Sequence, residues 1–318
     1  MVNNKTFENS PRSMTDAPFG QALVALGRRR SDVVALSADL SKYTDVIPFI
    51  KVFPQRFFNI GMAEQNLFSM AAGMARTGMV PYCTTFGVFA TRRAYDFMAI
   101  GCAHSHLNVK IFAGLPGLTT GYGGTHQATE DTGLARLIPD LVVIDPCDAT
   151  EIAQVVDAVA EYQGPVYVRL LRASVPAVLN PAGYQFVIGK AALLKEGGDI
   201  GFISTGFMTE RALDAAAELA KRGTKAGVLH VPTIKPLDTE AIARFAASVS
   251  HVLVAENHVS SGGLASQVAE VLYDSEVRTR MSRIGLPDRF IECGSVPTLQ
   301  RRYGLTVDRM IDVALAVA

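Results

Sequence analysis

The stretch FFNIGMAEQNLFSMAAGMARTGMVPYCTTF, residues 57–86, indicates the fold class of this chain. It opens with a strand-like segment around Phe57–Asn59 and continues as a helix of mostly small residues from about Ala63 to Thr77. It ends in an apolar, strand-like run at 80–86. Short apolar runs that alternate with helix-length amphipathic segments are typical of parallel α/β proteins.

The same alternation continues on both sides of this stretch. On the N-terminal side, Thr15 can cap a helix whose Phe19, Leu23 and Leu26 fall on one face. Further strands are expected at 33–37, 108–113, 141–145 and 165–171, and further helices after 86 through Tyr95 and from Ala149.

A segment rich in Pro, Asn and Gly at 175–189 has the composition of an interdomain linker. Beyond it the alternation restarts, with strands expected at 199–204, 226–231, 251–256 and 289–293, and helices at 209–222, 238–247, 263–273 and from about Thr306. We therefore predict two α/β domains, residues 1–180 and 181–318, each a mostly parallel sheet flanked by helices.

The composition limits the classes of function. Hydrophobic residues make up 49% of the 318 residues and charged residues 19%, a balance that suits buried parallel sheets or a large subunit interface. Lys plus Arg and Asp plus Glu number 30 each, so no global field favours nucleic acid or a membrane surface. An anionic substrate must therefore be held by local arginines.

The four cysteines, Cys83, Cys102, Cys147 and Cys293, show neither CxxC nor Cys/His ligand spacing. We expect buried, reduced thiols in preference to a disulfide framework or a zinc site. The first fourteen residues lack the basic start and apolar run of a signal peptide, and no stretch reaches the ~18 apolar residues of a spanning helix. These features favour a soluble, cytoplasmic protein.

Two segments of the first domain place candidate functional side chains at the ends of elements. GMAEQN (61–66) puts Glu64 at the start of a helix, where a carboxylate is usually only a favourable charge at the positive end of the dipole. TTFGVF (84–89) sets Phe86 and Phe89 three residues apart just past a strand. Such spacing is mostly core, although ligands gather at the carboxyl ends of parallel strands.

A third segment, GYGGTHQATED (121–131), ends a glycine-rich loop at 114–125 that is long for a simple connection. Glycines let the backbone approach a ligand closely, and the segment offers His126, Gln127 and two carboxylates. A histidine beside a glutamine at the end of such a loop is a better candidate for catalysis than a lone surface histidine.

A fourth segment, VRLLR (168–172), carries Arg169 and Arg172 near a strand end. Their forked guanidinium donors could form an anion clamp, and two solvated arginines are an equally good interpretation of the same pattern.

Taken in order, these segments resemble the pyrimidine-binding domain of the transketolase family, which includes deoxyxylulose-phosphate synthase. The resemblance is carried by 57–96 and 119–151, and VPTIKPLD (231–238) and VAENHVSSGGLASQVAEVL (254–272) resemble the family's C-terminal domain. It implies a transferase, dependent on thiamine diphosphate, that moves a two-carbon ketol unit from a ketose, expected to be phosphorylated, to an aldose.

The resemblance also implies roles for individual residues. A glutamate at the position of Glu64 hydrogen-bonds N1′ of the aminopyrimidine, so that the 4′ nitrogen can remove the thiazolium C2 proton. Phe86 and Phe89 match aromatic positions that pack on the pyrimidine, and Asp39 matches a family aspartate near the cofactor. For substrate binding the matching residues are His126, Gln127, Arg172 and, more weakly, Arg12, with His126 also assisting proton transfer.

The resemblance further implies a partner. Full-length transketolases bind the diphosphate and its metal through a GDG motif, which does not occur here. We therefore expect no metal ligands in this chain, a partner subunit holding the diphosphate with Mg²⁺ or Ca²⁺, and an α2β2 assembly.

Three departures concern the substrate pocket. Tyr122 stands where an aspartate normally contacts the sugar, FAGLPGL (112–118) lacks a second histidine, and Tyr43 replaces a small residue. The donor and acceptor sugars are therefore open, and xylulose 5-phosphate and branched or sulfonated ketoses are all candidates.

Other functions fit parts of the same pattern. The β subunit of a 2-oxoacid dehydrogenase has the same domains and an equivalent glutamate, but THQATED and the following IPDLVVIDPCD favour a transketolase. A deoxyxylulose-phosphate-synthase-like enzyme is a further alternative. A non-catalytic assembly subunit is disfavoured, because Glu64, Phe86 and His126 are all present.

Overall fold

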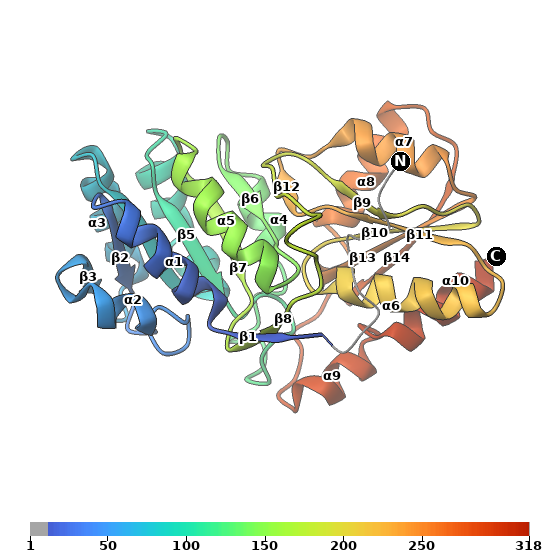
Figure 1. Ribbon diagram of the computed structural model, residues 1–318, viewed down its shortest axis with the longest axis horizontal. Helices are drawn as coiled ribbons and strands as arrows, with labels where there is room; N and C mark the ends of the chain where they lie inside the picture. Colours follow the sequence, from blue (N-terminus) through green and yellow to red (C-terminus); the bar gives the residue numbers. More distant parts are fainter. Residues whose placement is uncertain (1–11, 318) are drawn as a thin grey trace.

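Two sheets, one of seven strands and one of five, form the two halves of the molecule in the computed structural model, which describes residues 12–317 (Figure 1). The predicted α/β class is confirmed, because both sheets are mostly parallel and are flanked by helices. None of the helices in this part of the chain is both long and apolar enough to cross a membrane.

The seven-stranded sheet has the order β12-β6-β7-β5-β4-β2-β3, with only β12 antiparallel to its neighbour. Its strands are β2 (Val33–Ser37), β3 (Phe57–Asn59), β4 (Val80–Phe86), β5 (Lys110–Gly114), β6 (Val142–Ile144), β7 (Val166–Leu170) and β12 (Thr233–Lys235). Most of these strands are buried along their whole length, because helices cover both faces of a parallel sheet.

Alternate residues of β2 show how the two faces are used. Val33 and Ala35 belong to one apolar cluster with Phe19 and Leu23 of α1 (Pro18–Arg29). Val34 and Leu36 belong to a second cluster with residues of α3. The helical segments of this half are α1, α2 (Ile47–Val52), η1 (Pro54–Arg56), α3 (Glu64–Arg76), η2 (Phe89–Arg93), η3 (Phe97–Ala103), α4 (Asp131–Arg136) and α5 (Ala149–Glu161).

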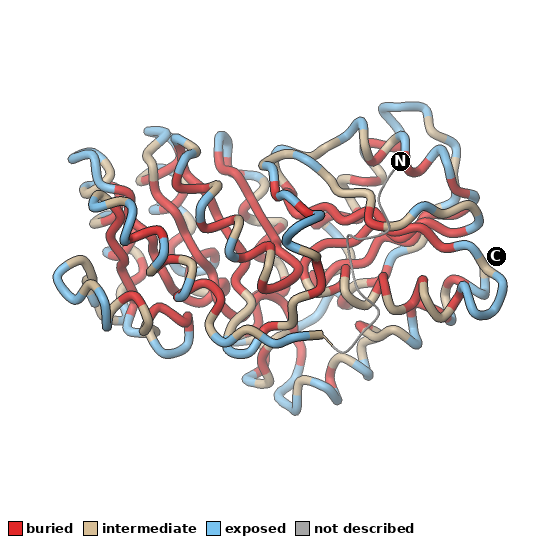
Figure 2. The backbone as a smooth tube through the Cα atoms, viewed as in Figure 1, coloured by how far each residue is buried: buried red, intermediate tan, exposed pale blue. Residues whose placement is uncertain are grey.

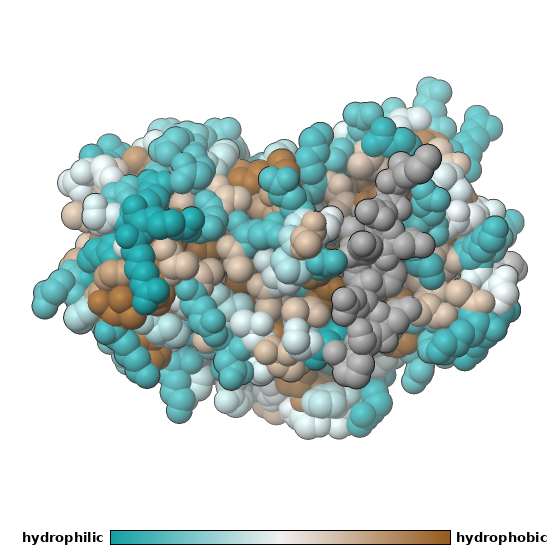
Figure 3. All heavy atoms as spheres, in the orientation of Figure 1, coloured by the Kyte–Doolittle hydropathy of each residue, from teal (hydrophilic) through white to brown (hydrophobic). Residues whose placement is uncertain are grey.

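The five-stranded sheet has the order β14-β13-β10-β11-β9. Its strands are β9 (Ala192–Lys195), β10 (Ile200–Ser204), β11 (Ala226–His230), β13 (His251–Val259) and β14 (Arg280–Leu286), and β9 is the antiparallel edge. The helices are α6 (Met208–Lys221), α7 (Thr239–Ala247), α8 (Leu264–Asp274), α9 (Val296–Arg302) and α10 (Val307–Val317). Hydrophilic side chains are spread over the face in Figure 3, with smaller hydrophobic areas such as the one over α2.

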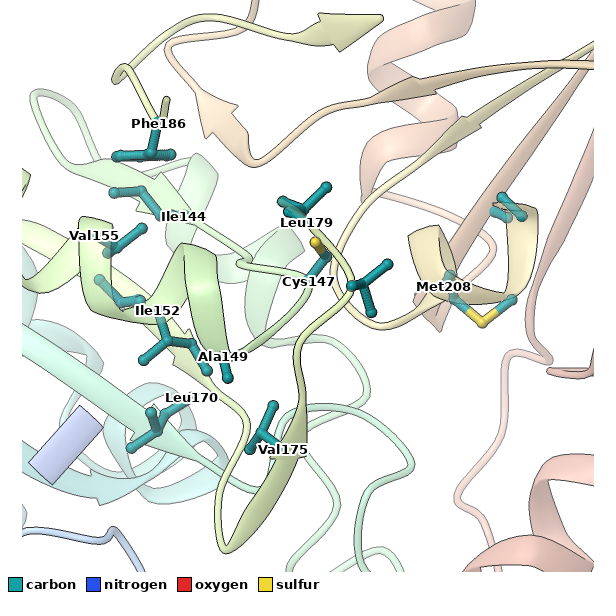
Figure 4. Close-up of a cluster of buried hydrophobic side chains, with 14 of the residues drawn as sticks. Ile144, Cys147, Ala149, Ile152, Val155, Leu170, Val175, Leu179, Phe186 and Met208 are labelled. Atoms are coloured by element: carbon teal, nitrogen blue, oxygen red, sulfur yellow. The ribbon is translucent and has the colours of Figure 1, made fainter. Parts of the chain in front are cut away.

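The two halves are joined more closely than a free linker would allow. β12 comes from the second half of the chain but pairs with β6 of the first sheet. A separate two-stranded sheet pairs β1 (Met14–Asp16) with β8 (Ser174–Pro176), both from the first half of the chain. Within the predicted linker at 175–189, Leu179 and Phe186 are buried in the cluster that also contains Met208 (Figures 2 and 4). The segment does connect the two halves, but it is not a free linker, because its apolar residues pack into a shared core.

A buried polar cluster lies between the halves as well. His230 Nε2 is 2.9 Å from Glu151 Oε2, and Glu151 also accepts a hydrogen bond from the hydroxyl of Tyr184. His230 Nδ1 is 2.8 Å from Thr209 Oγ1. Burial lowers the pKa of His230, but the Glu151 carboxylate outweighs that effect and leaves the pKa raised.

Three local predictions were wrong. Thr15 lies in β1 and does not cap a helix, because α1 begins at Pro18 after Ala17, whose φ is 47°. The helix expected after β4 is instead two π-helical segments, η2 and η3. The strand expected at 289–293 is irregular, and the last strand of the sheet is the earlier β14.

Candidate active site

Glu64 is the first residue of α3 and lies at the carboxyl edge of the first sheet. Its side chain is only 1% exposed. Oε2 accepts a hydrogen bond from Arg93 Nη1 at 2.7 Å, and Oε1 accepts one from Thr85 Oγ1 at 3.4 Å. The carboxylate is therefore buried at the positive end of a helix dipole, with one guanidinium as its charge partner.

Phe86 and Phe89 form an aromatic wall beside this carboxylate. Their ring centroids are 5.8 Å apart, and Arg93 Cζ lies 4.3 Å from the Phe89 centroid while it also binds Glu64. The wall belongs to a small apolar cluster at the end of β4, separate from the two large ones. A carboxylate next to two tilted phenyl rings suits a flat heteroaromatic ring that carries a protonated nitrogen.

His126 lies directly after the glycine-rich loop (114–125), and its ring packs near the same aromatic wall. Its ring centroid is 5.5 Å from that of Phe89 and 6.2 Å from that of Phe86. Nδ1 lies 2.9 Å from Thr125 Oγ1, and Tyr122 also packs edge-on against the imidazole. The fold thus brings together side chains from 64, 86, 89 and 126 that the sequence had marked separately.

An open cavity of about 530 Å³ lies at this point. Its walls include Tyr43, Phe86, Tyr122, His126 and Cys293. Tyr122 and Tyr43, the two departures noted in the sequence, are thus both part of the cavity lining.

The cavity has a contribution from the second half of the molecule that was not predicted. Gly294 N donates a hydrogen bond to Gly121 O at 3.0 Å, and a Cβ at Gly121 would lie 2.0 Å from Gly294 O. A glycine is therefore required at 121, where two backbones touch. This contact places Cys293 at the cavity. The expectation of a buried thiol was therefore wrong for Cys293, whereas Cys83, Cys102 and Cys147 are buried.

Asp39 lies just after β2 at the same carboxyl edge. Its Oδ1 accepts a hydrogen bond from Asn59 Nδ2 at 2.9 Å, and its backbone N–H donates to Asn59 Oδ1. The residue is exposed and has a φ of 60°, and the next residue, Leu40, lines the cavity. Its carboxylate is thus available to a group outside the chain.

The remaining substrate-site candidates are placed differently from one another. Arg172 is half-buried, and its Cζ lies 5.7 Å from the ring centroid of Tyr43. Gln127 is fully buried and donates to Thr120 O, while its Oε1 has no partner among the described residues. Arg12 pairs with Glu210 and Asp214 of α6 and does not line the cavity.

Arg169 is neither part of an anion clamp nor a solvated arginine, which corrects both interpretations of VRLLR for this residue. It is 1% exposed, and it binds Asp131 Oδ1 and Asp145 Oδ2 at 3.0 Å each and Asn257 O at 2.9 Å. Burial alone would lower the pKa of Arg169, but the two carboxylates outweigh burial and raise it. Arg169 is a structural link between the halves.

Potential metal ligands are not gathered at the cavity. Among residues 12–317, the one group of three close His, Cys, Asp or Glu ligand atoms is that of Cys147, Glu151 and His230 between the halves, where Glu151 and His230 already bind each other. Arg93 and Cys293 are the residues here that sequence reasoning missed. The pair Arg92-Arg93 just after the aromatic segment was the available signal for the first, and the second had none.

Known families and proteins match nearly the whole chain. The family described as "Transketolase, pyrimidine binding domain" matches residues 12–177, and "Transketolase, C-terminal domain" matches residues 189–310. A transketolase family protein of Sinorhizobium fredii is 55% identical over 93% of this chain and 86% of its own length. The 6-deoxy-6-sulfo-D-fructose transketolase subunit of a Clostridium species is 38% identical over 92% of this chain and 90% of its own length.

A solved structure shares the fold over nearly the whole chain. It is described as a split gene transketolase, an inactive β4 tetramer, and it matches with a TM-score of 0.87 and 40% identity. The match covers 95% of this chain and 97% of that one.

Proposed function

The chain belongs to the transketolase family, as a split-type subunit with the pyrimidine-binding and C-terminal domains of a thiamine-diphosphate enzyme, and from this premise we propose its part in catalysis. We propose that it supplies the cofactor-activating half of an active site that transfers a two-carbon ketol unit from a ketose to an aldose. The single observation that carries the proposal is the buried Glu64 carboxylate beside the Phe86–Phe89 wall.

The aminopyrimidine end of the cofactor fits the residues that are present. Glu64 would hold a proton against N1′ of the ring, and Phe86 and Phe89 would pack on its face. Asp39 would contact the cofactor from the carboxyl end of β2. When bound, thiamine diphosphate supplies the carbon centre at which the ketol unit leaves the donor and joins the acceptor.

His126 and Arg172 would act on the sugar. Because Nδ1 of His126 is engaged with Thr125, Nε2 is the ring nitrogen left to donate to, or accept a proton from, a substrate oxygen. Arg172 has no hydrogen bond or ion pair with the described residues, so it can hold a phosphate or sulfonate. Gln127 would hold the loop backbone through Thr120 and contribute to binding with its unpartnered Oε1.

Arg12 is a weaker match to a substrate-binding position than Arg172, and it already binds two carboxylates of α6. Its proposed role requires it to leave Glu210 and Asp214.

We further propose that a partner subunit completes the site by holding the diphosphate and a Mg²⁺ or Ca²⁺ ion, in an α2β2 assembly. Exposed apolar residues close to α3 support a contact there: Met62 is 79% exposed, Ile100 59% and Phe97 38%. Burying such side chains drives stable association. The solved relative described as an inactive β4 tetramer also indicates that subunits of this type associate with one another without activity.

The division of labour between domains is proposed on the same basis. We assign pyrimidine binding to residues 1–180 and the C-terminal domain to 181–318, supported by family matches that end at 177 and resume at 189. We place the protein in the cytoplasm, supported by four cysteines that are all free.

The test is the assembled enzyme, co-expressed with a GDG-bearing subunit and assayed with ketose donors and aldehyde acceptors. Glu64→Gln should lower kcat by at least the ~10²–10⁴ typical of a general acid–base group. Glu218→Gln, at a distant position on α6, is the control and should leave kcat unchanged. A near-normal rate for E64Q, or full activity of this chain alone, would refute the proposal.

A further inference from the structure

Arg92 joins the aromatic wall to the segment that carries His126. It lies in η2, three residues after Phe89. Its guanidinium binds both carboxylate oxygens of Glu130, with Nε donating to Oε1 and Nη2 donating to Oε2 at 2.8 Å. Glu130 directly precedes α4, so it lies at the end of the segment 124–130. One side chain therefore ties η2 to the far end of this segment.

The same guanidinium holds the backbone on both sides of His126. Nη1 donates to Gly124 O at 2.6 Å, and Nη2 lies 3.4 Å from Gln127 O. These carbonyls belong to the residue two positions before His126 and to the residue directly after it. Because the guanidinium is a rigid, planar set of donors, it fixes all these acceptors relative to one another. The backbone around His126 cannot shift away from η2 without losing at least one of these hydrogen bonds.

The second half of the molecule contacts this arrangement through Phe290. Arg92 Cζ lies 5.4 Å from the ring centroid of Phe290, within the range of a cation–π contact. A Cβ at Gly124 would lie 3.0 Å from Phe290 Cδ1, so the ring is also close to the loop backbone. Arg92 is therefore placed between η2, the segment of His126 and the segment at 290–294.

The pair of Arg92 and Glu130 is only partly buried, with 28% and 32% of the two side chains exposed. Burial raises the pKa of Glu130, but hydrogen bonds from Arg92 and Thr129 outweigh burial and leave the pKa lowered. Partly solvated ion pairs contribute little to global stability. A substitution at Arg92 should therefore leave the chain folded and act on the position of the segment.

We propose that Arg92 is a positioning residue that, together with Glu130, fixes the imidazole of His126 at the Phe86–Phe89 wall. The inference rests on the role proposed above for His126 in proton transfer to or from the substrate. A displacement of about 1 Å in a catalytic group can cost about 10²-fold in rate. Arg92 thus influences the rate without a contact to the substrate, while its neighbour Arg93 binds Glu64.

The first test measures hydrogen exchange in the full chain, without a partner subunit. The amides of His126 and Gln127 donate to Gly123 O at 2.9 and 3.1 Å, so their protection reports on the segment. Arg92→Met should speed their exchange about tenfold or more, the factor expected for the loss of a charge-assisted hydrogen bond. Arg244→Met, which removes an exposed Arg–Glu pair of α7, is the control and should leave their exchange unchanged.

The second test measures ketol transfer by the assembled enzyme. Arg92→Met should lower kcat about 10–100-fold, while the affinity for thiamine diphosphate is kept because Glu64 and the aromatic wall are untouched. Arg92→Lys should recover part of the rate, because its ammonium can still bind Glu130. Glu130→Gln leaves the carbonyl contacts of Arg92 and should cost less than R92M. R244M should have the parental kcat.

A double-mutant cycle with His126→Ala separates positioning from a general structural effect. If Arg92 acts through His126, R92M should lower kcat no further in the H126A background. A further loss as large as that in the parent would overturn the inference, and so would parental exchange at His126 and Gln127 in R92M.

The exchange test also keeps this inference apart from the proposed function. E64Q should abolish most of the ketol transfer yet show the exchange rates of the parent at His126 and Gln127. If the assembled parent transfers no ketol unit, the proposed function fails, and the exchange rates of R92M still decide whether Arg92 holds the segment.

Discussion

The guanidinium of Arg93 binds Glu64 Oε2 at 2.7 Å while it lies 4.3 Å above the ring of Phe89. It therefore covers both the carboxylate and the aromatic face that we assign to the cofactor ring. Arg93 is 42% exposed, whereas Glu64 is 1% exposed. Arg93 is thus the more exposed member of the pair. A ring that binds against the buried Glu64 carboxylate must displace Arg93.

Arg93→Met should lower the free energy of unfolding of the chain by about 1–2 kcal/mol, the lower range for a charge-assisted hydrogen bond because the arginine is partly solvated. In E64Q the same change should cost much less, because no charge is left unpaired. Urea unfolding of the four members of this double-mutant cycle measures the coupling. Arg92→Met, whose arginine binds Glu130 instead, is the control and should show no coupling to Glu64.

Arg172 and Arg169 should respond in opposite ways to substitution. Arg172→Ala should weaken the binding of a phosphorylated or sulfonated donor by about 1.5–3 kcal/mol, seen as a raised KM. Stability should change little, because Arg172 makes no hydrogen bond or ion pair with the described residues. Initial-rate kinetics of the assembled enzyme measure this. An unchanged KM would remove Arg172 from the substrate site.

Arg169→Met should instead destabilise the fold by about 3–5 kcal/mol, because it leaves Asp131 and Asp145 buried without their partner. Chemical unfolding of the isolated chain is the measurement. A variant as stable as the parent would contradict the structural role assigned to this arginine.

The Glu151–His230 pair predicts a stability effect with a defined pH window. The pKa of His230 is raised above 6.5, so its contribution is complete below pH 6.5 and is lost as pH rises through the folded value. The pKa of Glu151 is lowered below 4.5, so its contribution is complete above pH 4.5 and is lost as pH falls through the folded value. Glu151→Gln should therefore cost most between these limits, on the order of 3–5 kcal/mol.

Unfolding of E151Q and the parent at pH 5.5 and pH 9 checks this window. If E151Q loses the same free energy of unfolding at both pH values, a charged His230 does not strengthen the pair.

Lys110 predicts an opposite trend at higher pH. Burial lowers its pKa from 10.5 to about 7, and its amine donates to two backbone carbonyls, Tyr162 O and Gly164 O, at 2.7 Å each. Between about pH 7 and 10.5 the unfolded chain binds more protons at this site, so stability should rise with pH over that range. In Lys110→Met that part of the slope should vanish, as measured by unfolding at several pH values.

The parts of the fold that could be predicted are those with a strong local signal. β2 and β4 are continuous apolar runs, and the structure places them where the sequence suggested, with α3 within a residue of its expected bounds. β12 could not be predicted, since three residues gain their strand conformation only by pairing with β6. The π-helical segments after β4 were read as an ordinary helix because their apolar spacing is similar over so few turns.

The candidate site, like the fold, could be predicted only in part. Glu64, Phe86 and His126 could be proposed because the segments that carry them resemble those of the transketolase family. Cys293 could not, because only the contact between Gly121 and Gly294 brings it to the cavity. Arg169 and Arg172 are indistinguishable in VRLLR, and their difference comes from burial beside Asp131 and Asp145.

The backbone contact between Gly121 and Gly294 has a consequence for changing which sugars are accepted. Residues 290–294 carry none of the proposed catalytic groups, yet they rest on the loop that shapes the cavity mouth. Lengthening, shortening or re-sequencing that segment would alter the width of the entrance without touching the machinery at Glu64. Selection of variants for new donor sugars could therefore begin at residues 290–294, in the domain that does not contain Glu64.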